Sequence, residues 1–245
     1  MFYGMNPEQT RRFGEALRAM KEIQPRIFAA DMVIALARNM GFLRDAAFMQ
    51  AMNAEPRSRQ EKSLVWRLHV LCWAAESALA VEGDFVECGV FKGLSTSVVA
   101  HYLDFGKRDR TWYLYDTFAG IPAEQLDAGR SNPKEYQDAG LYPSVVRRFA
   151  AYSNIRVNQG RVPEVLAQSS PQRIAFMHID MNSAAAEVAA LEVLFDRMTP
   201  GGLLVLDDYG WYWYRDQKKA EDPFFLKRGL KVLELPTGQG LVLKR

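Results

Sequence analysis

Apolar positions follow two different rhythms along the chain. Over residues 59–80 they recur every three or four positions, which is the spacing of one face of a helix. Ser58 and Glu61 form the pattern of a capping box at the start of this helix. A second helix is expected over residues 25–39, and no convincing strand precedes residue 83. We therefore expect an N-terminal helical cap over residues 1–82.

From residue 83 onwards, short apolar runs alternate with helical stretches. The runs predict seven strands, at residues 84–88, 111–115, 155–157, 174–179, 203–206, 231–235 and 241–244. The intervening stretches predict helices at residues 93–103, 145–152, 184–197 and 214–227. Strands that alternate with helices indicate a parallel sheet covered on both faces.

The last two predicted strands break this rhythm. A short turn that contains glycine joins them, so they form a hairpin and the last strand runs antiparallel to its neighbour. The expected fold is α/β and Rossmann-like, with a seven-stranded, mostly parallel sheet and an antiparallel terminal strand. This is the shape of class I methyltransferases, and we assign it to a domain over residues 83–245.

The segment 86–93 (Val-Glu-Cys-Gly-Val-Phe-Lys-Gly) follows the first strand and opens a helix. Glycines let the backbone approach a ligand closely, and the N–H groups of a helix start favour a carboxylate or phosphate. The spacing of Gly89 and Gly93 differs from the pyrophosphate-binding fingerprint. Glu87, just before them, suits an amino group better than a phosphate. S-adenosylmethionine has an ammonium, a carboxylate and a ribose, and it fits this segment; a plain strand-to-helix turn is the alternative.

Asp116 ends the next strand, where an acid can accept hydrogen bonds from ribose hydroxyls. The alternative is that Asp116 caps the turn at residues 117–120. Together, the residues that we expect to contact the cofactor are Glu87, Gly89, Gly93, Ser95, Thr96, Asp116, Thr117 and Gly160.

Three aspartates close the fourth and fifth strands, namely Asp180, Asp207 and Asp208. Ligands of open α/β sheets bind outside the carboxyl ends of the strands, so we expect these acids to converge near the cofactor. Converging carboxylates repel one another, and hard oxygen ligands select Mg²⁺, Ca²⁺ or Mn²⁺. A divalent cation there would orient a substrate hydroxyl and lower its pKa. The alternative is that the acids cap the elements that follow them.

His178 shares one face of its strand with Asp180. It is either a buried, hydrogen-bonded residue or a catalytic base. The catalytic residues that we predict are Asp180, Asp208 and His178.

With these motifs the chain resembles the macrocin-type O-methyltransferases, which methylate sugar hydroxyls in antibiotic pathways. The resemblance covers about residues 60–245 and rests on the segments 86–93, 115–120, 178–180 and 200–210. It implies cofactor contacts from Glu87, Gly89 and Asp116, and Mg²⁺ ligation by Asp180, Asp207 and Asp208. Members of this family often carry a second acid, a candidate general base, two residues after the first metal aspartate. Here that position is Asn182, which cannot take a proton.

Two further segments bear on the acceptor. Aromatic residues at 209 and 211–214 either stack on a sugar or planar acceptor, or simply pack. The polar stretch 122–142 is long for a plain connection, which indicates a lid over the substrate, with disorder as the alternative.

Composition bears on which classes of partner the chain can have. The formal net charge is only +2 and the basic residues are scattered, which argues against a nucleic-acid surface. Cys72 and Cys88 lie in apolar segments and are expected to be buried thiols in a reducing cytoplasm. No signal peptide is apparent, and no apolar stretch approaches the roughly 18 residues of a membrane span.

We therefore expect a cytoplasmic enzyme with a small-molecule acceptor, a sugar or glycoside, and neither a nucleic-acid nor a membrane partner. Homo-oligomerisation stays open. The alternative functions are methylation of a phenol or catechol, non-catalytic binding of S-adenosylmethionine, and a nicotinamide-dependent dehydrogenase.

Overall fold

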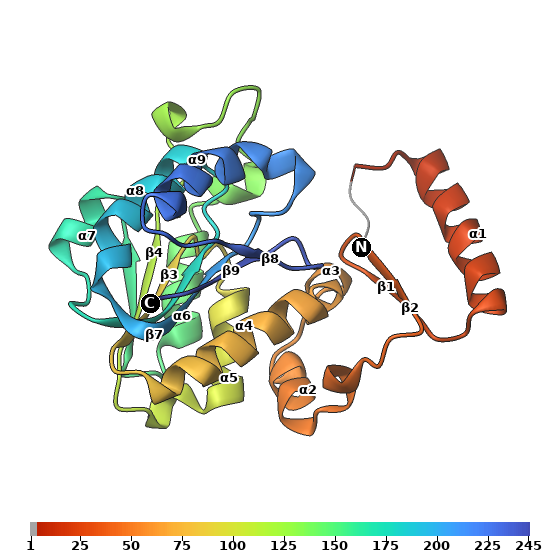
Figure 1. Cartoon of the computed structure of the whole chain (residues 1–245), viewed down its shortest axis with the longest axis horizontal. Coiled ribbons are helices and arrows are strands. Elements are labelled where there is room, and N and C mark those ends of the chain that lie inside the picture. The colour runs from red at the N-terminus through yellow and green to blue at the C-terminus, as the bar shows by residue number, and fades with distance from the viewer. Residues whose placement is uncertain (1–3) are drawn as a thin grey trace. The chain divides into compact units, whose positions relative to one another are not determined.

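Seven strands form one sheet in the C-terminal part of the chain, as shown in Figure 1 for the computed structural model, which describes residues 4–245. The strands are β3 (Asp84–Cys88), β4 (Trp112–Asp116), β5 (Ile155–Gln159), β6 (Ile174–Ile179), β7 (Met198–Leu206), β8 (Leu233–Glu234) and β9 (Gly240–Leu243). Their order in the sheet is β5-β4-β3-β6-β7-β9-β8. β3 to β7 pair in parallel, and β9 runs antiparallel to both β7 and β8. The predicted parallel sheet and its terminal hairpin are confirmed.

Helices cover both faces of this sheet. Figure 1 shows α8 and α9 on one face and α5 and α6 on the other. The α-helices of this part are α5 (Leu94–Leu103), α6 (Leu141–Phe149), α7 (Glu164–Gln168), α8 (Ala184–Leu194) and α9 (Arg215–Leu226). Short 3₁₀ turns lie at η2 (Ala78–Ala80), η3 (Phe105–Lys107), η4 (Ala123–Gln125), η5 (Lys134–Gln137), η6 (Phe195–Arg197) and η7 (Tyr212–Tyr214). Of the five α-helices, α5, α6, α8 and α9 were predicted, although α6 begins and ends earlier than expected. The short helix α7 was not predicted.

Alternation along the strands divides the core into two layers. On one face, Val86 and Cys88 of β3 belong to a buried cluster that includes Leu191 of α8 and Phe225 of α9. The opposite face carries Phe85, whose ring lies against three other aromatic rings, those of Phe105, Trp112 and Phe176. Glu87 shares this second face with Phe85, so a buried carboxylate lies on the aromatic side of the sheet.

The chain divides into two compact units, one ending at His69 and the other beginning at Val70. The first unit contains α1 (Pro7–Ile23), β1 (Ile27–Ala30), β2 (Val33–Leu36), η1 (Gly41–Arg44), α2 (Ala46–Asn53), α3 (Arg59–Ser63) and the start of α4 (Val65–Ser77). The predicted capping box is present, because the Ser58 side chain accepts from the Glu61 N–H and the Glu61 carboxylate accepts from the Ser58 N–H. The long helix expected over 59–80 is interrupted near Leu64 and is therefore two helices followed by a 3₁₀ turn.

The helix predicted over residues 25–39 is wrong, and so is the expectation that no strand precedes residue 83. β1 and β2 form an antiparallel hairpin in which Ala30 pairs with Val33. Its two-residue turn, Asp31-Met32, has positive φ at both positions, which matches the twist of a hairpin. A short apolar run cannot by itself be distinguished as helix or strand, and here the turn geometry decided it.

Cys72 and Cys88 are both buried and are not joined by a disulfide, as predicted. Among residues 4–245, no helix is both long enough and apolar enough to cross a membrane. The expectation about a signal peptide depends partly on residues 1–3, which lie outside the described residues.

Candidate active site

The loop between β3 and α5 is held against the loop that follows β6. The N–H of Asp180 donates to the carbonyl oxygen of Cys88 at 2.8 Å. Gly89 has a φ of +88°, and a Cβ added there would lie 1.8 Å from the carbonyl oxygen of Asp180. Glycine is therefore required at position 89 by the neighbouring backbone. Gly93, with a φ of +75°, precedes the first turn of α5 in the left-handed conformation.

Asp116 ends β4 and its carboxylate holds two loops in place. Its Oδ2 accepts hydrogen bonds from the backbone N–H groups of Val90 at 2.7 Å and Phe91 at 2.8 Å. Its Oδ1 accepts from the N–H of Phe118 at 2.7 Å, which is the turn cap considered as the alternative role. Asp116 thus caps its own turn and also orders the glycine loop.

A cleft of about 740 Å³, partly open to solvent, lies beyond the carboxyl ends of the central strands. Of the predicted cofactor contacts, Gly89, Asp116, Thr117 and Gly160 line this cleft. The other four, namely Glu87, Gly93, Ser95 and Thr96, are not among its lining residues. Their contacts with a cofactor stay a prediction.

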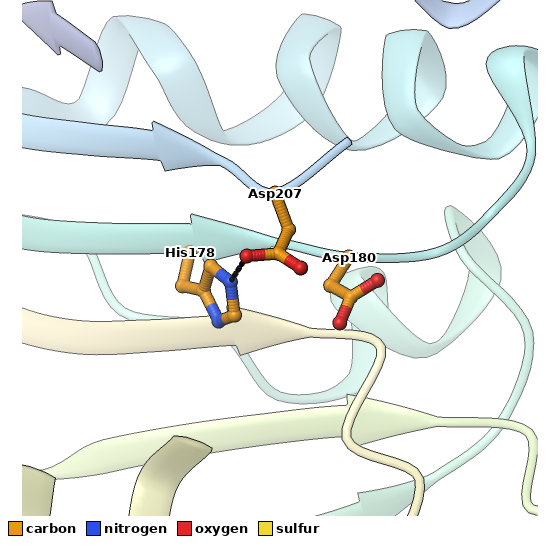
Figure 2. Close-up of side chains that lie close together, drawn as sticks. All are labelled: His178, Asp180 and Asp207. Atoms are coloured by element: carbon orange, nitrogen blue, oxygen red, sulfur yellow. Dashed lines mark ion pairs between the residues drawn. The ribbon is translucent and has the colours of Figure 1, made fainter. Parts of the chain in front are cut away.

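Glu87 and His178 form a buried pair beneath the site. They are register partners on β3 and β6, so their side chains emerge on the same face of the sheet. His178 Nδ1 lies 2.9 Å from Glu87 Oε1, and the Thr96 hydroxyl donates to Glu87 Oε2. On its other side, His178 Nε2 lies 3.5 Å from Asp207 Oδ1, as the dashed line in Figure 2 marks.

The surroundings of His178 determine its charge. Burial lowers the pKa of His178, but the interactions with Asp207 and Glu87 outweigh it and raise this pKa to about 10. The two carboxylates thus favour the protonated form of the imidazole. This favours the buried, hydrogen-bonded role over that of a catalytic base, and the catalytic role stays a prediction.

Two of the three predicted acids meet at the end of β6 and β7. One ligand atom from each of His178, Asp180 and Asp207 lies within 4.8 Å of the others, and Figure 2 shows the two carboxylates side by side. Within residues 4–245, this group does not include Asp208. The negative charge of Asp208 instead helps to raise the pKa of Tyr136, of Tyr214 and of Glu187.

Asn182 occupies a strained position beside this cluster. Its φ is +55°, a left-handed conformation that asparagine tolerates better than most residues. Its Nδ2 donates to Asp180 Oδ1 at 3.3 Å, and its buried Oδ1 has no hydrogen-bond partner. Asn182 also lines the cleft. Its amide hydrogen-bonds to the Asp180 carboxylate, whereas an ionised acid at position 182 would repel that carboxylate.

The polar stretch 122–142 is an ordered strap over the cleft, and its contacts were not visible in the sequence. The ring of Tyr136 lies 5.0 Å from that of Phe91 in an edge-on arrangement. Arg130 donates to the carbonyl oxygen of Trp213 at 3.1 Å, and its guanidinium lies 3.9 Å from the centre of the Tyr214 ring. Burial and then the charge of Asp208 raise the pKa of Tyr214 to about 12.

The aromatic residues after Asp208 have divergent environments. Tyr209 is buried in the core, whereas Tyr212 is 75% exposed and Trp213 45% exposed. The rings of Trp211 and Trp213 stack at 5.8 Å. Packing therefore accounts for Tyr209, while Trp213 and Tyr214 contact Arg130 of the strap.

Comparison with known proteins gives the family. Residues 63–231 match the sequence model of the family described as Macrocin-O-methyltransferase (TylF). The chain belongs to the macrocin O-methyltransferase family. This family membership makes the protein an O-methyltransferase, and it confirms the resemblance inferred from the sequence.

Two characterised proteins are similar to this macrocin O-methyltransferase family member. Mycinamicin III 3''-O-methyltransferase of Micromonospora griseorubida is 28% identical over 189 residues, which cover 69% of this chain and 74% of that protein. The 8-demethyl-8-(2,3-dimethoxy-alpha-L-rhamnosyl)-tetracenomycin-C 4'-O-methyltransferase of Streptomyces olivaceus is 29% identical over 156 residues, covering 58% and 60%.

Solved structures confirm the fold of this macrocin O-methyltransferase family member. The O-methyltransferase NovP superposes with a TM-score of 0.66 at 19% identity, over 84% of this chain and 99% of that one. The calicheamicin methyltransferase CalS11 superposes with a TM-score of 0.64 at 17% identity, over 99% and 95%. The class I methyltransferase architecture predicted from the strand pattern is thus confirmed.

Proposed function

We propose that this O-methyltransferase transfers the methyl group of S-adenosylmethionine to a hydroxyl on the sugar of a glycosylated natural product. The observation that carries the proposal is the position of Asp180, which lines the cleft and also belongs to the acidic cluster. A donor in the cleft and an acceptor at the cluster would therefore meet at one residue. The related tetracenomycin enzyme is named for a rhamnosyl compound, which supports a sugar acceptor.

The donor side of the site is built from backbone. Gly89 and Gly160 line the cleft without side chains beyond Cα, and Asp116 orders the loop that contains Gly89. S-adenosylmethionine supplies an electrophilic methyl on a positively charged sulfur. In the reaction the S–CH₃ bond breaks, an O–CH₃ bond forms at the acceptor, and the hydroxyl proton leaves. We expect most of the rate enhancement to come from alignment of the two reactants.

The carboxylates fit a hard divalent cation such as Mg²⁺. Asp180 and Asp207 present oxygen atoms within 4.8 Å of each other, and oxygen ligands are those that Mg²⁺ prefers. Asp208 follows directly and is the proposed third ligand or the acceptor of the hydroxyl proton. When bound, the cation supplies positive charge that lowers the pKa of a coordinated hydroxyl. Because Asn182 cannot accept a proton and the carboxylates beside His178 favour its protonated form, we take Asp208 as the predicted base.

The proposed catalytic residues all lie in the C-terminal part of the chain. We propose residues 83–245 as the methyltransferase domain and residues 1–82 as a helical cap that also contains the β1–β2 hairpin.

Methyl transfer from labelled S-adenosylmethionine to a panel of glycosides tests the function directly. Asp180→Ala should reduce turnover at least about 100-fold while cofactor affinity, measured by calorimetry, stays within about 2-fold. Asp109→Ala is the matched control, because Asp109 is an exposed aspartate outside the site. It follows α5 in the sequence, whereas the glycine loop precedes α5. Turnover that survives in Asp180→Ala would refute the assignment of the acids.

The same assay separates the alternatives. A chelator should remove activity and added Mg²⁺ should restore it; undiminished turnover after stripping would refute the role of the cation. Methylation of catechols in preference to glycosides would replace the sugar acceptor with a phenol. Cofactor binding without product from any acceptor would indicate a non-catalytic binding protein.

A further inference from the structure

A buried glutamine from the C-terminal hairpin contacts the acidic cluster. Gln239 is fully buried, and its Nε2 donates to Asp207 Oδ1 at 2.9 Å. The antiparallel register explains the contact, because Leu206 pairs with Gly240 and the residues beside them, Asp207 and Gln239, are therefore adjacent. The hairpin thus delivers a polar side chain from near the end of the chain to the end of β7.

The orientation of the Gln239 amide is itself determined. The hydroxyl of Thr237, a residue only 2% exposed, donates to Gln239 Oε1 at 2.9 Å. A carboxamide has one accepting end and one donating end, so this bond directs the NH₂ group to Asp207. By holding the oxygen end of the amide, the Thr237 hydroxyl ensures that the NH₂ end donates to the Asp207 carboxylate.

Two nitrogen atoms lie beside one oxygen of Asp207. Gln239 Nε2 lies 2.9 Å from Oδ1 and His178 Nε2 lies 3.5 Å from the same atom. In Figure 2 the second oxygen of Asp207 lies on the side of Asp180. The Gln239 hydrogen bond to Oδ1 restricts rotation of the carboxylate and keeps its other oxygen facing the cluster.

We propose that Gln239 is a positioning residue for Asp207, and that Thr237 acts through it to hold the carboxylate ready for a divalent cation. This inference rests on the cation site of the proposed function. Groups that hydrogen-bond to a ligating side chain set its orientation, and their loss typically weakens metal binding 10–100-fold. The cluster is therefore assembled from three parts of the chain, namely the ends of β6 and β7 and the β8–β9 turn.

Binding of Mn²⁺ alone to the full chain, followed by electron paramagnetic resonance, tests this role without relying on turnover. Gln239→Leu should raise the Kd for Mn²⁺ about 10–100-fold, while the Kd for S-adenosylhomocysteine changes less than about 2-fold. Thr237→Val should act in the same direction by a smaller factor, because the amide remains but can turn. Thr199→Val is the matched control, since its hydroxyl bonds to the carbonyl oxygen of Glu82 at the far end of β7.

The outcomes distinguish the inference from the proposed function. If the wild-type chain binds Mn²⁺ and both Gln239→Leu and Thr237→Val bind it equally well, the positioning role is refuted and the cation site stands. If the wild-type chain binds no Mn²⁺, the cation site fails and the positioning role fails with it. Should Gln239→Leu not fold, as judged by circular dichroism, Thr237→Val decides the question, because valine matches threonine in shape.

Discussion

Glu87 and His178 occupy equivalent positions on neighbouring parallel strands, and Glu87 Oε1 lies 2.9 Å from His178 Nδ1 in the interior of the sheet. Both side chains are at most 2% exposed. The imidazolium is thus held between Glu87 and Asp207, and a buried charge that loses its partner is costly. The pair fixes the end of β6, from which Asp180 extends to the cleft.

Glu87→Gln is expected to lower the free energy of unfolding by about 3 kcal/mol, because it leaves the imidazolium with a neutral acceptor. Urea denaturation followed by circular dichroism measures this change. Glu82→Gln is the control, since Glu82 pairs with Arg173 at an exposed site and its loss should have little effect. Equal losses in the two variants would contradict a special role for the buried pair.

Gly89→Ala tests the close approach of the two loops. The added Cβ would meet the carbonyl oxygen of Asp180, so we expect a loss of at least about 3 kcal/mol and of cofactor binding. Gly229→Ala has the same sign of φ, +67°, but nothing within 4 Å of the added Cβ. This control isolates backbone strain, about 1–2 kcal/mol, from the clash. Thermal unfolding that moves equally in both variants would rule out the clash.

A buried carboxyl pair predicts a dependence of stability on pH. Glu187 of α8 accepts from the N–H of Met181 at 3.0 Å, and Glu221 of α9 lies fully buried nearby. Burial raises the pKa of both, that of Glu221 to about 7, so the folded chain holds a proton that the unfolded chain releases. This stability is fully present below pH ~4.5 and is lost as the pH rises through about 7.

Glu221→Gln should remove this loss, because the amide stays neutral at every pH. We expect the free energy of unfolding of the wild type to fall by up to about 1.4 kcal/mol per pH unit between pH ~5 and ~7, relative to the variant. Denaturation at several pH values measures the difference. Glu192→Gln, at an exposed site on α8, should keep the wild-type slope. Parallel curves for wild type and Glu221→Gln would show that the pair is not protonated.

Arg130→Ala should loosen the strap over the cleft. It removes the hydrogen bond to the Trp213 carbonyl oxygen and the stacking on Tyr214, together worth about 1–2 kcal/mol, and should raise KM about 5–30-fold. Proteolysis within residues 122–142 should also become faster. Arg156→Ala is matched to it, because Arg156 likewise lies over a tyrosine ring, that of Tyr113, away from the strap. An unchanged KM in Arg130→Ala would show that the strap does not gate the site.

Asn182→Asp examines the destination of the acceptor proton. An acid at this position can take the proton only when it is ionised, so the acidic limb of the pH–rate profile of kcat, which Asp208 is proposed to set in the wild type, should shift. Affinity for Mn²⁺ should rise, because a third carboxylate faces the cluster beside Asp180. Initial rates between pH ~5 and ~8 measure the profile. A profile identical to that of the wild type would mean that proton removal does not depend on this position.

The sequence predicted the sheet well because strand alternation and terminal turns are local signals. The β1–β2 hairpin was missed because its decisive feature is two residues with positive φ, Asp31 and Met32, and neither is a glycine. The pairing of Glu87 with His178 depends on β3 lying beside β6, across 91 residues of sequence. The contact of Gln239 with Asp207 likewise depends on a register that no local pattern reveals.

The contact between Gly89 and Asp180 also limits how the enzyme can diversify. Because the proposed donor loop and the proposed acceptor acid touch through backbone, side-chain substitutions at positions other than Gly89 leave the separation between them unchanged. New acceptors must then be accommodated by the surroundings, of which the strap over residues 122–142 is the most easily altered. We would accordingly look for acceptor preference in the strap when swapping segments between relatives, and leave the two loops untouched.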